Sequence, residues 1–158
     1  MKQWIEKQYG NRVRARACGI CTKADKLLMV NHRGLTDGDF WAPPGGGIEL
    51  TESAEESLAR EFREETGLTV KVQDYLFVCE FIALPLHTLE VFFKVECLDG
   101  DLKTGRDPEM TEKKQLITDV RFLSWDEIGS IDSRFRHGLF HLVPSPAQIL
   151  DLRGYFKL

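Results

Sequence analysis

The sequence has no long apolar run, since no segment approaches the roughly 18 consecutive apolar residues that a membrane-spanning helix needs. Its opening residues, MKQWIEKQYGNRVR, lack the apolar stretch and small-residue cleavage pattern of a signal peptide. The chain also lacks an excess of positive charge, because its formal net charge is −4. A basic surface is what a nucleic-acid binder needs for the phosphate backbone. We therefore expect a cytoplasmic protein that neither crosses a membrane nor binds nucleic acid.

Cysteines are few, and their spacing argues against a shared site. Cys18 and Cys21 form a CxxC pair, a spacing that is typical of zinc or redox sites in other contexts. They lie in RARACGICTK, which reads as a strand, and a separation of three residues places them on opposite faces of it. Cys79 and Cys97 stand alone in apolar, strand-like runs. We expect all four to be free thiols, most of them buried.

The length of 158 residues suits one domain, spanning 1–158, around one core. Alternating apolar residues and turn residues predict several strands and fewer helices. The combination indicates an α/β fold in which helices pack on a mixed sheet. Strands are expected at 13–22, 26–31, 40–42, 69–82, 88–98 and 117–123, and helices at 53–66, from 124 onward, and within the tail at 144–158.

The helix at 53–66 carries charge in an unusual place. It begins with a capping box formed by Ser53 and Glu56 and stops at a glycine. On a helical wheel, Glu65 projects along the apolar stripe, and Glu61 and Glu64 border it. Like charges at these spacings repel by a few tenths of a kcal/mol per pair, and carboxylates near a helix C-terminus cost about 0.3–1 kcal/mol each.

A solvated acidic face is the ordinary interpretation of such a charge run, but it does not explain glutamates beside the apolar stripe. A divalent cation would remove these penalties together, and Mg²⁺ prefers carboxylate oxygens. The preceding stretch, FWAPPGGGIEL, adds three consecutive glycines that allow a phosphate or a metal to approach the backbone. The glycine stretch alone is compatible with a plain turn. Beside the glutamates, it suggests the second wall of a site.

These residues resemble the signature of the Nudix hydrolase family. Gly46 is followed after five residues by Glu52, and seven further residues lead to REFREETGL, which runs from Arg60 to Leu68. Every fixed position of the family signature is matched. The resemblance implies an α/β/α sandwich around a mixed β-sheet. It also implies a pyrophosphohydrolase that uses Mg²⁺ or Mn²⁺ to cleave a diphosphate bond in a nucleoside diphosphate derivative.

The resemblance also implies roles for individual residues. Glu61, Glu64 and Glu65, with the carbonyl of Gly46, are implied metal ligands. Arg60 would orient a glutamate, and Glu52 would hold the loop against the helix through Arg60. The general base is left open between Glu61 and Glu64 within the helix, and Glu109 and Glu112 in the loop RDPEMTEKK, which are equally well interpreted as solvated acids.

Substrate contacts are predicted less specifically. Arg33, or Arg14 and Arg16 on one face of the first strand, could reach a phosphate, although Arg33 could equally be a solvated surface residue. Gly45 and Gly46 would contact the substrate through the backbone. Trp41 or Phe81 could stack on a base, but a core position is favoured for both. His137 and His141 have the i, i+4 spacing of metal ligands, and zinc is disfavoured because no third ligand is evident.

Two functions are consistent with the sequence. The first is an enzyme acting on a nucleotide-type small molecule, with ADP-ribose-like compounds and (deoxy)nucleoside triphosphates both open as substrates. The alternative is a non-catalytic module that senses a nucleotide, which is disfavoured because all the glutamates of the signature are present. Dimers are common in the family, so a homodimer is possible.

Overall fold

The computed structural model of the protein describes residues 2–33, 38–104 and 117–158. The candidate bases Glu109 and Glu112 lie outside the described residues. Within the described part of the chain, no helix combines the length and the apolar character needed to cross a membrane. The elements are α1 (Lys2–Tyr9), β1 (Arg12–Lys23), β2 (Lys26–His32), β3 (Trp41–Ala42), β4 (Gly45–Gly47), α2 (Ala54–Thr66), β5 (Thr69–Ala83), β6 (Leu86–Asp99), β7 (Ile117–Ser124), α3 (Trp125–Ser130), the 3-10 turns Ser133–Phe135, Gly138–His141 and Pro146–Asp151, and β8 (Gly154–Lys157).

The strands form a mixed sheet in the order β3-β2-β1-β6-β5-β8, with β4 added beside β1 and β7 beside β2. β1 runs parallel to β6, and β5 runs parallel to β8, while the other pairs are antiparallel. A hairpin joins β1 and β2, the strands expected at 13–22 and 26–31. It turns at Ala24 and Asp25, whose φ angles of 49° and 58° are those of a tight turn between twisted strands.

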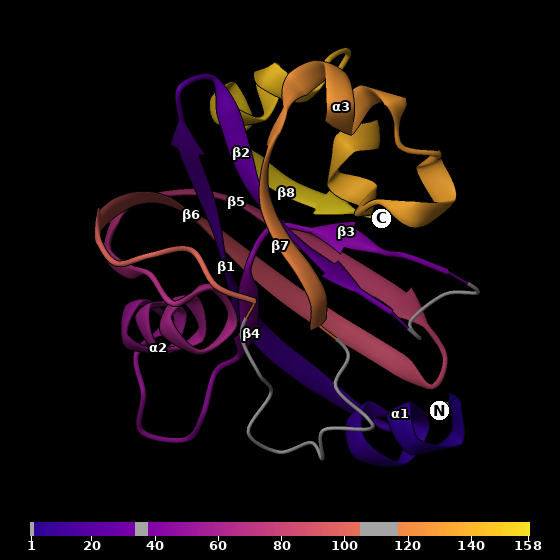
Figure 1. The fold of residues 1–158 in the computed structure, drawn as a ribbon. Coiled ribbons are helices and arrows are strands. Elements are labelled where there is room, and N and C mark those ends of the chain that lie inside the picture. Colours follow the sequence, from indigo (N-terminus) through magenta and orange to yellow (C-terminus); the bar gives the residue numbers. More distant parts are fainter. Residues whose placement is uncertain (1, 34–37, 105–116) are drawn as a thin grey trace.

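Helical segments cover both faces of this sheet (Figure 1). On one face, Cys18 and Ile20 of β1 pack in a cluster with Ile128 of α3 and with apolar residues of the 3-10 turns. On the other face, Ala17 and Cys21 pack in a cluster with α2. This arrangement confirms the predicted α/β sandwich. It also confirms that the two cysteines of the CxxC pair point to opposite faces, and all four cysteines are free.

Helix α2 forms where its end signals predict it. The Ser53 side chain accepts a hydrogen bond from the backbone N–H of Glu56, and the Glu56 side chain accepts one from the backbone N–H of Ser53. Gly67 ends the helix in the left-handed region, with φ 77°, and its N–H donates to the carbonyl of Arg63. Leu58 and Phe62 are fully buried, so the apolar stripe faces the sheet as expected.

The structure differs from the sequence expectations in three places. The helix expected in the tail is a short 3-10 helix at Pro146–Asp151, and the last residues form the edge strand β8. Gly154, with φ 120°, is the first residue of β8, which pairs with β5. The glycines Gly45–Gly47 form strand β4 rather than a loop, since they pair with Arg16 to Cys18 of β1. The N-terminal helix α1 was not expected.

Candidate active site

An open cleft of about 1600 Å³ lies at one end of the sheet. One wall is formed by β4 and the C-terminal half of α2, and the floor by the first half of β1 and the facing part of β6. Helix α1 and the turn between β5 and β6 lie at one side of the cleft, and the 3-10 turns near the C-terminus lie at the other. Helix α2, with the candidate glutamates, strand β4, with the candidate glycines, and strand β1, with the candidate arginines, all contribute residues to this cleft.

The three α2 glutamates line this cleft together. Glu65 is 7% exposed, and the side chains of Glu61 and Glu64 are 15% and 31% exposed. Burial raises the pKa of Glu61 above its usual value, Arg60 opposes this, and the negative charge of Glu64 adds to it. The Glu61 carboxylate is therefore held where its negative charge is unfavourable without a cation.

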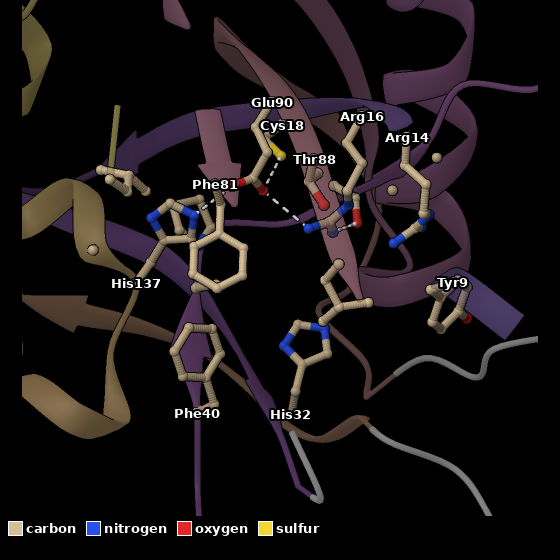
Figure 2. Close-up of a pocket in the computed structure, with 18 of the residues that line it drawn as sticks. Tyr9, Arg14, Arg16, Cys18, His32, Phe40, Phe81, Thr88, Glu90 and His137 are labelled. Carbon is tan, nitrogen blue, oxygen red and sulfur yellow. Dashed lines mark hydrogen bonds and ion pairs between the residues drawn. The ribbon is translucent and has the colours of Figure 1, made fainter. Parts of the chain in front are cut away.

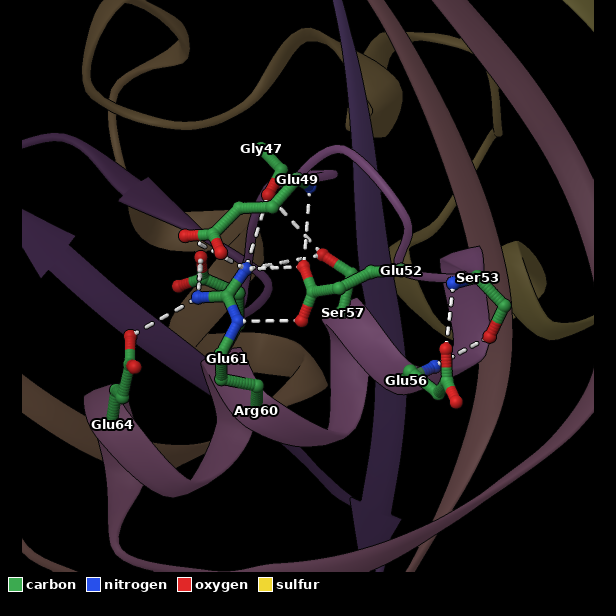
Figure 3. Close-up of polar contacts among 9 residues, drawn as sticks. All are labelled: Gly47, Glu49, Glu52, Ser53, Glu56, Ser57, Arg60, Glu61 and Glu64. Atoms are coloured by element: carbon green, nitrogen blue, oxygen red, sulfur yellow. Dashed lines mark hydrogen bonds and ion pairs between the residues drawn. The ribbon is translucent and has the colours of Figure 1, made fainter.

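Arg60 organises these carboxylates (Figure 3). Its Nε and Nη2 donate to the two oxygens of Glu52 at 2.8 and 2.9 Å, in a bidentate pair. Its Nη1 donates to Glu61 Oε1 at 3.0 Å and to Glu64 Oε2 at 3.3 Å. Nη2 also donates to the carbonyl of Gly47 at 3.3 Å. The guanidinium thus joins the loop that precedes α2 to the glutamates, in the arrangement that the sequence implied for Arg60 and Glu52.

The glycine strand β4 lies directly against the glutamates. The backbone N–H of Gly45 donates to Glu65 Oε2 at 3.4 Å. A β-carbon on Gly46 would overlap the carboxyl group of Glu61, and one on Gly45 would overlap the backbone of β1. These two positions require glycine because no space exists for a side chain between β4 and its neighbours.

Replacing Gly46 by alanine is expected to lower both stability and turnover. The new methyl group would displace the Glu61 carboxyl group, and overpacking of this kind costs about 1–3 kcal/mol. Urea unfolding and steady-state kinetics would measure both effects. The matched control is Gly129→Ala in α3, where an added β-carbon meets nothing within 4 Å. Equal stability of the Gly46 and Gly129 variants would contradict the close contact.

The carboxylate and carbonyl groups at this wall have the chemistry that Mg²⁺ and Mn²⁺ prefer. In the described part of the chain, however, no three His, Cys, Asp or Glu side chains stand close enough to enclose an ion. The geometry gives a reason: Glu61 and Glu64 are turned toward Arg60, and Glu65 toward the N–H of Gly45. The donor set fits a hard divalent cation, and metal binding by Glu61, Glu64, Glu65 and Gly46 remains a prediction.

A second polar cluster lies deeper in the cleft around Glu90 of β6 (Figure 2). Arg16 Nη1 donates to Glu90 Oε2 at 2.9 Å, and Nη2 donates to the carbonyl of Gly45 at 3.1 Å. His137 Nε2 lies 2.7 Å from Glu90 Oε1, while His137 Nδ1 accepts from the N–H of Leu139. Because Nδ1 is an acceptor, Nε2 carries the proton and donates to Glu90. Glu90 thereby connects the glycine strand to the C-terminal turns.

The charge of Glu90 makes this cluster sensitive to acid. Burial alone would raise the pKa of Glu90, but His137 and Arg16 stabilise the carboxylate and lower the pKa to about 2, from an ordinary value of 4.5. A depressed carboxylate pKa stabilises the fold above the unfolded value and loses this effect as the pH falls through the folded value. We expect the stability advantage of the native protein over Glu90→Gln to be constant above pH 4.5 and to vanish toward pH 2. Urea unfolding of both proteins across this range would measure it, and a difference that does not change with pH would contradict it.

Some of the predicted substrate-contacting residues line the cleft, and others lie outside it. Arg16 and Phe81 line the cleft, as do Gly45 and Gly46. Arg33 does not: its side chain is 67% exposed and pairs with Asp39 at 3.3 Å. Trp41 packs against the apolar cluster of the α3 face and lies outside the cleft. Arg33 and Trp41 are therefore left out of the site proposed below.

Other residues of the site were not anticipated from the sequence. Glu90, Thr88 and His32 line the cleft, and so does Tyr9 of α1. A signal for Glu90 was available, because it is a charged residue inside the apolar strand sequence HTLEVFFKV. His137 and His141 both border the cleft, but the ring of His137 is committed to Glu90 and to the N–H of Leu139.

The α/β sandwich and the glutamate-rich helix beside a glycine strand agree with the Nudix resemblance of the sequence. The profile of the NUDIX domain matches residues 10–144 of this chain. The chain therefore belongs to the Nudix family.

Individual relatives agree with this assignment. An ADP-ribose pyrophosphatase of Methanocaldococcus jannaschii is 33% identical over 96 residues, which are 60% of this chain and 57% of that protein. A nucleoside triphosphatase, NudI, of Salmonella heidelberg is 48% identical over 46 residues, 29% of this chain and 32% of its own length. The chain thus matches about half or less of these two relatives. A solved NUDIX hydrolase of Nitrosomonas europaea shares the fold with a TM-score of 0.70 and 19% identity, covering 89% of this chain and 87% of that one.

Proposed function

We propose that this protein is a metal-dependent pyrophosphohydrolase that cleaves a diphosphate bond in a nucleoside diphosphate derivative. The observation that carries the proposal is the cleft wall, which three α2 glutamates line together and where Glu65 and Glu61 lie against Gly45 and Gly46. A large cleft with a phosphate-compatible backbone and clustered carboxylates is what such a reaction requires. Membership of the Nudix family supports it, as does similarity to a pyrophosphatase and to a triphosphatase.

Each residue at the wall has a distinct part in this mechanism. Glu61, Glu64 and Glu65, with the carbonyl of Gly46, would hold Mg²⁺ or Mn²⁺. When bound, the ion supplies positive charge that neutralises phosphate oxygens and activates the attacking water. Arg60 and Glu52 act on the glutamates rather than on the substrate, because the bidentate pair fixes the guanidinium that contacts Glu61 and Glu64. Arg60 is therefore a positioning residue.

A carboxylate must accept the proton of the attacking water. Within the described residues, Glu61 and Glu64 both border the cleft and both are available for this role. Glu109 and Glu112, outside the described residues, are the further candidates. Measuring kcat against pH for a glutamine variant of each would narrow the choice, because loss of the base changes the acidic limb of the profile.

The test of the proposed function is a product screen. The purified protein would be incubated with Mg²⁺, and then with Mn²⁺, against ADP-ribose, NADH, diadenosine polyphosphates, nucleotide sugars and all (deoxy)nucleoside triphosphates, and the products would be separated by chromatography. Cleavage of a diphosphate bond that stops when EDTA is added is the expected result. Absence of cleavage throughout, together with a thermal shift on nucleotide addition, would favour the nucleotide-sensing alternative instead.

Two further properties belong to this proposal. We place the protein in the cytoplasm, where its nucleotide-type substrates occur, and we expect a monomer or a homodimer in solution. Size-exclusion chromatography with light scattering would establish the oligomeric state.

A further inference from the structure

Three arginines form a row along one face of β1. Arg12, Arg14 and Arg16 occupy alternate positions of the strand, so their side chains lie on the same side of the sheet. All three line the cleft. The row begins at the glycine strand, where Arg16 donates to the carbonyl of Gly45, and extends toward α1, where Arg12 donates to the carbonyl of Gln8 at 2.7 Å.

The members of this row differ in how their charge is compensated. Arg16 is paired with the buried carboxylate of Glu90 at 2.9 Å. Among the residues that the structure describes, no carboxylate forms an ion pair with Arg14. Burial lowers the pKa of Arg14 to about 10, the positive charges of Arg16 and Arg12 add to this, and Tyr9 and Glu90 oppose it only in part. The free protein therefore holds a half-buried guanidinium whose charge is opposed by its surroundings, and an anion would relieve this.

Arg14 is nevertheless held in a defined position. Its guanidinium carbon lies 4.1 Å from the ring centroid of Tyr9, a cation–π contact made by the last residue of α1. The Tyr9 ring in turn packs edge-on against Trp4, with the ring centroids 5.7 Å apart. On the other side, a β-carbon on Gly47 would lie 3.6 Å from Nη2 of Arg14. The guanidinium is thus fixed beside β4, next to the wall where the glutamates lie.

The two sides of the cleft differ in chemistry. Arg14 and Tyr9 lie on one side in Figure 2, and Phe40, Phe81 and His137 lie on the other, with Arg16 between them. Phe40 and Phe81 are only partly buried, so both rings are accessible from the cleft. His32 also faces it, and its Nδ1 is buried with no hydrogen-bond partner among the described atoms. One side therefore suits phosphate groups, and the other suits a base with hydrogen-bonding edges.

We propose that Arg14, supported by Tyr9 and flanked by Arg12, binds the terminal phosphate of a nucleoside triphosphate, and that this class of substrate is preferred to ADP-ribose-like compounds. A terminal phosphate carries nearly two negative charges near neutral pH, which suits an uncompensated guanidinium with a second one beside it. In ADP-ribose, each phosphate is esterified to a ribose, so the compound has no terminal phosphate. This inference rests on the hydrolase function proposed above and adds the substrate class.

The test compares ATP with ADP-ribose. Both contain ADP, which is followed by a terminal phosphate in ATP and by a ribose in ADP-ribose. KM and kcat would be measured for the native protein and for Arg14→Gln, Arg14→Lys, Tyr9→Leu and, as a matched control, Arg153→Gln. Arg153 is exposed, lies outside the cleft lining and donates only to nearby backbone carbonyls among the described residues. Removing the Arg14 charge relieves repulsion, so Arg14→Gln is expected to fold normally, which urea unfolding would verify.

We expect native kcat/KM to be higher for ATP than for ADP-ribose. Arg14→Gln should raise KM for ATP about 10- to 100-fold, the loss that follows from removing one charge-assisted hydrogen bond. Its KM for ADP-ribose should stay within about twofold. Arg14→Lys should recover most of the affinity for ATP, Tyr9→Leu should lose part of it, and Arg153→Gln should leave it unchanged. Equal effects of Arg14→Gln on both substrates would overturn the inference while leaving the hydrolase function intact.

A binding experiment separates this inference from the proposed function. The affinity for inorganic tripolyphosphate in the presence of Mg²⁺ would be measured by calorimetry for the native protein and Arg14→Gln. A 10- to 100-fold weaker affinity in the variant supports the phosphate site even if no compound is hydrolysed. An unchanged affinity would overturn the inference even if the native protein proves to be an active hydrolase.

Discussion

Replacing Glu64 by glutamine is expected to lower kcat at least about 100-fold, the range found when a catalytic carboxylate is lost. Glu64 lines the cleft beside Glu61 and Glu65, and its Oε2 accepts from Arg60 at 3.3 Å. Glutamine keeps the size of the side chain and removes the charge that would hold a divalent ion or accept a proton. Initial rates at saturating substrate and Mg²⁺ would measure the effect.

The same substitution should leave the fold almost unchanged. Glu64 is one of several partners of Arg60, and the bidentate pair with Glu52 remains in the variant. Removing one of three clustered negative charges also reduces repulsion, so the free energy of unfolding should change by less than about 0.5 kcal/mol without metal. Glu55→Gln is the control, because Glu55 is an exposed glutamate in the first turn of the same helix. Activity of the Glu64 variant equal to that of the Glu55 variant would remove Glu64 from the site.

Replacing Glu90 by glutamine is expected to lower the free energy of unfolding by about 3–5 kcal/mol at pH 7, the cost of leaving a buried charge without its partner. Glu90 is 4% exposed and has two strong contacts, to Arg16 at 2.9 Å and to His137 at 2.7 Å. The variant would keep the Arg16 charge inside the cleft and weaken the hydrogen bond from His137. Urea unfolding, followed by circular dichroism, would measure the change.

Glu96→Gln provides the comparison for the Glu90 variant. Glu96 lies on β6, on the same strand as Glu90, but it is exposed, and its side chain accepts a hydrogen bond from Gln73. Its substitution should change stability by less than about 0.5 kcal/mol. If both variants lose the same stability, the destabilisation reflects strand propensity and not the buried ion pair. Adding Arg16→Met to Glu90→Gln should recover part of the loss, because it removes the charge left unpaired.

The parts of the site that are local in sequence were predictable. Ser53, Glu56 and Gly67 define the ends of α2, and the spacing from Glu52 to Arg60 already places both on the same loop-helix unit. The family resemblance implied a contact between them, and the structure shows it as a bidentate pair. The position of Glu65 beside the apolar stripe follows from helical geometry alone, and it is indeed nearly buried.

The parts that depend on strand pairing were not predictable in the same way. Arg16 and Glu90 are 74 positions apart and meet because β1 runs parallel to β6, with the two residues in register. The tail became a strand because an open edge of β5 was available to pair with it. In each case, the partner is chosen by tertiary structure, which the local pattern does not encode.

One face of β1 has two parts: its first half lines the cleft with arginines, and its second half packs in the core. Beyond Arg16, the face that carries the arginine row continues as Cys18 and Ile20, which belong to the core. Substitutions at Arg12 and Arg14 therefore change the cleft and its contacts with α1 without disturbing the apolar core. An insertion of one residue after Arg16 would instead exchange the two faces of everything that follows it, sending Cys18 and Ile20 toward α2. New specificity in this scaffold is therefore expected to arise by substitution in β1 and not by a change in its length.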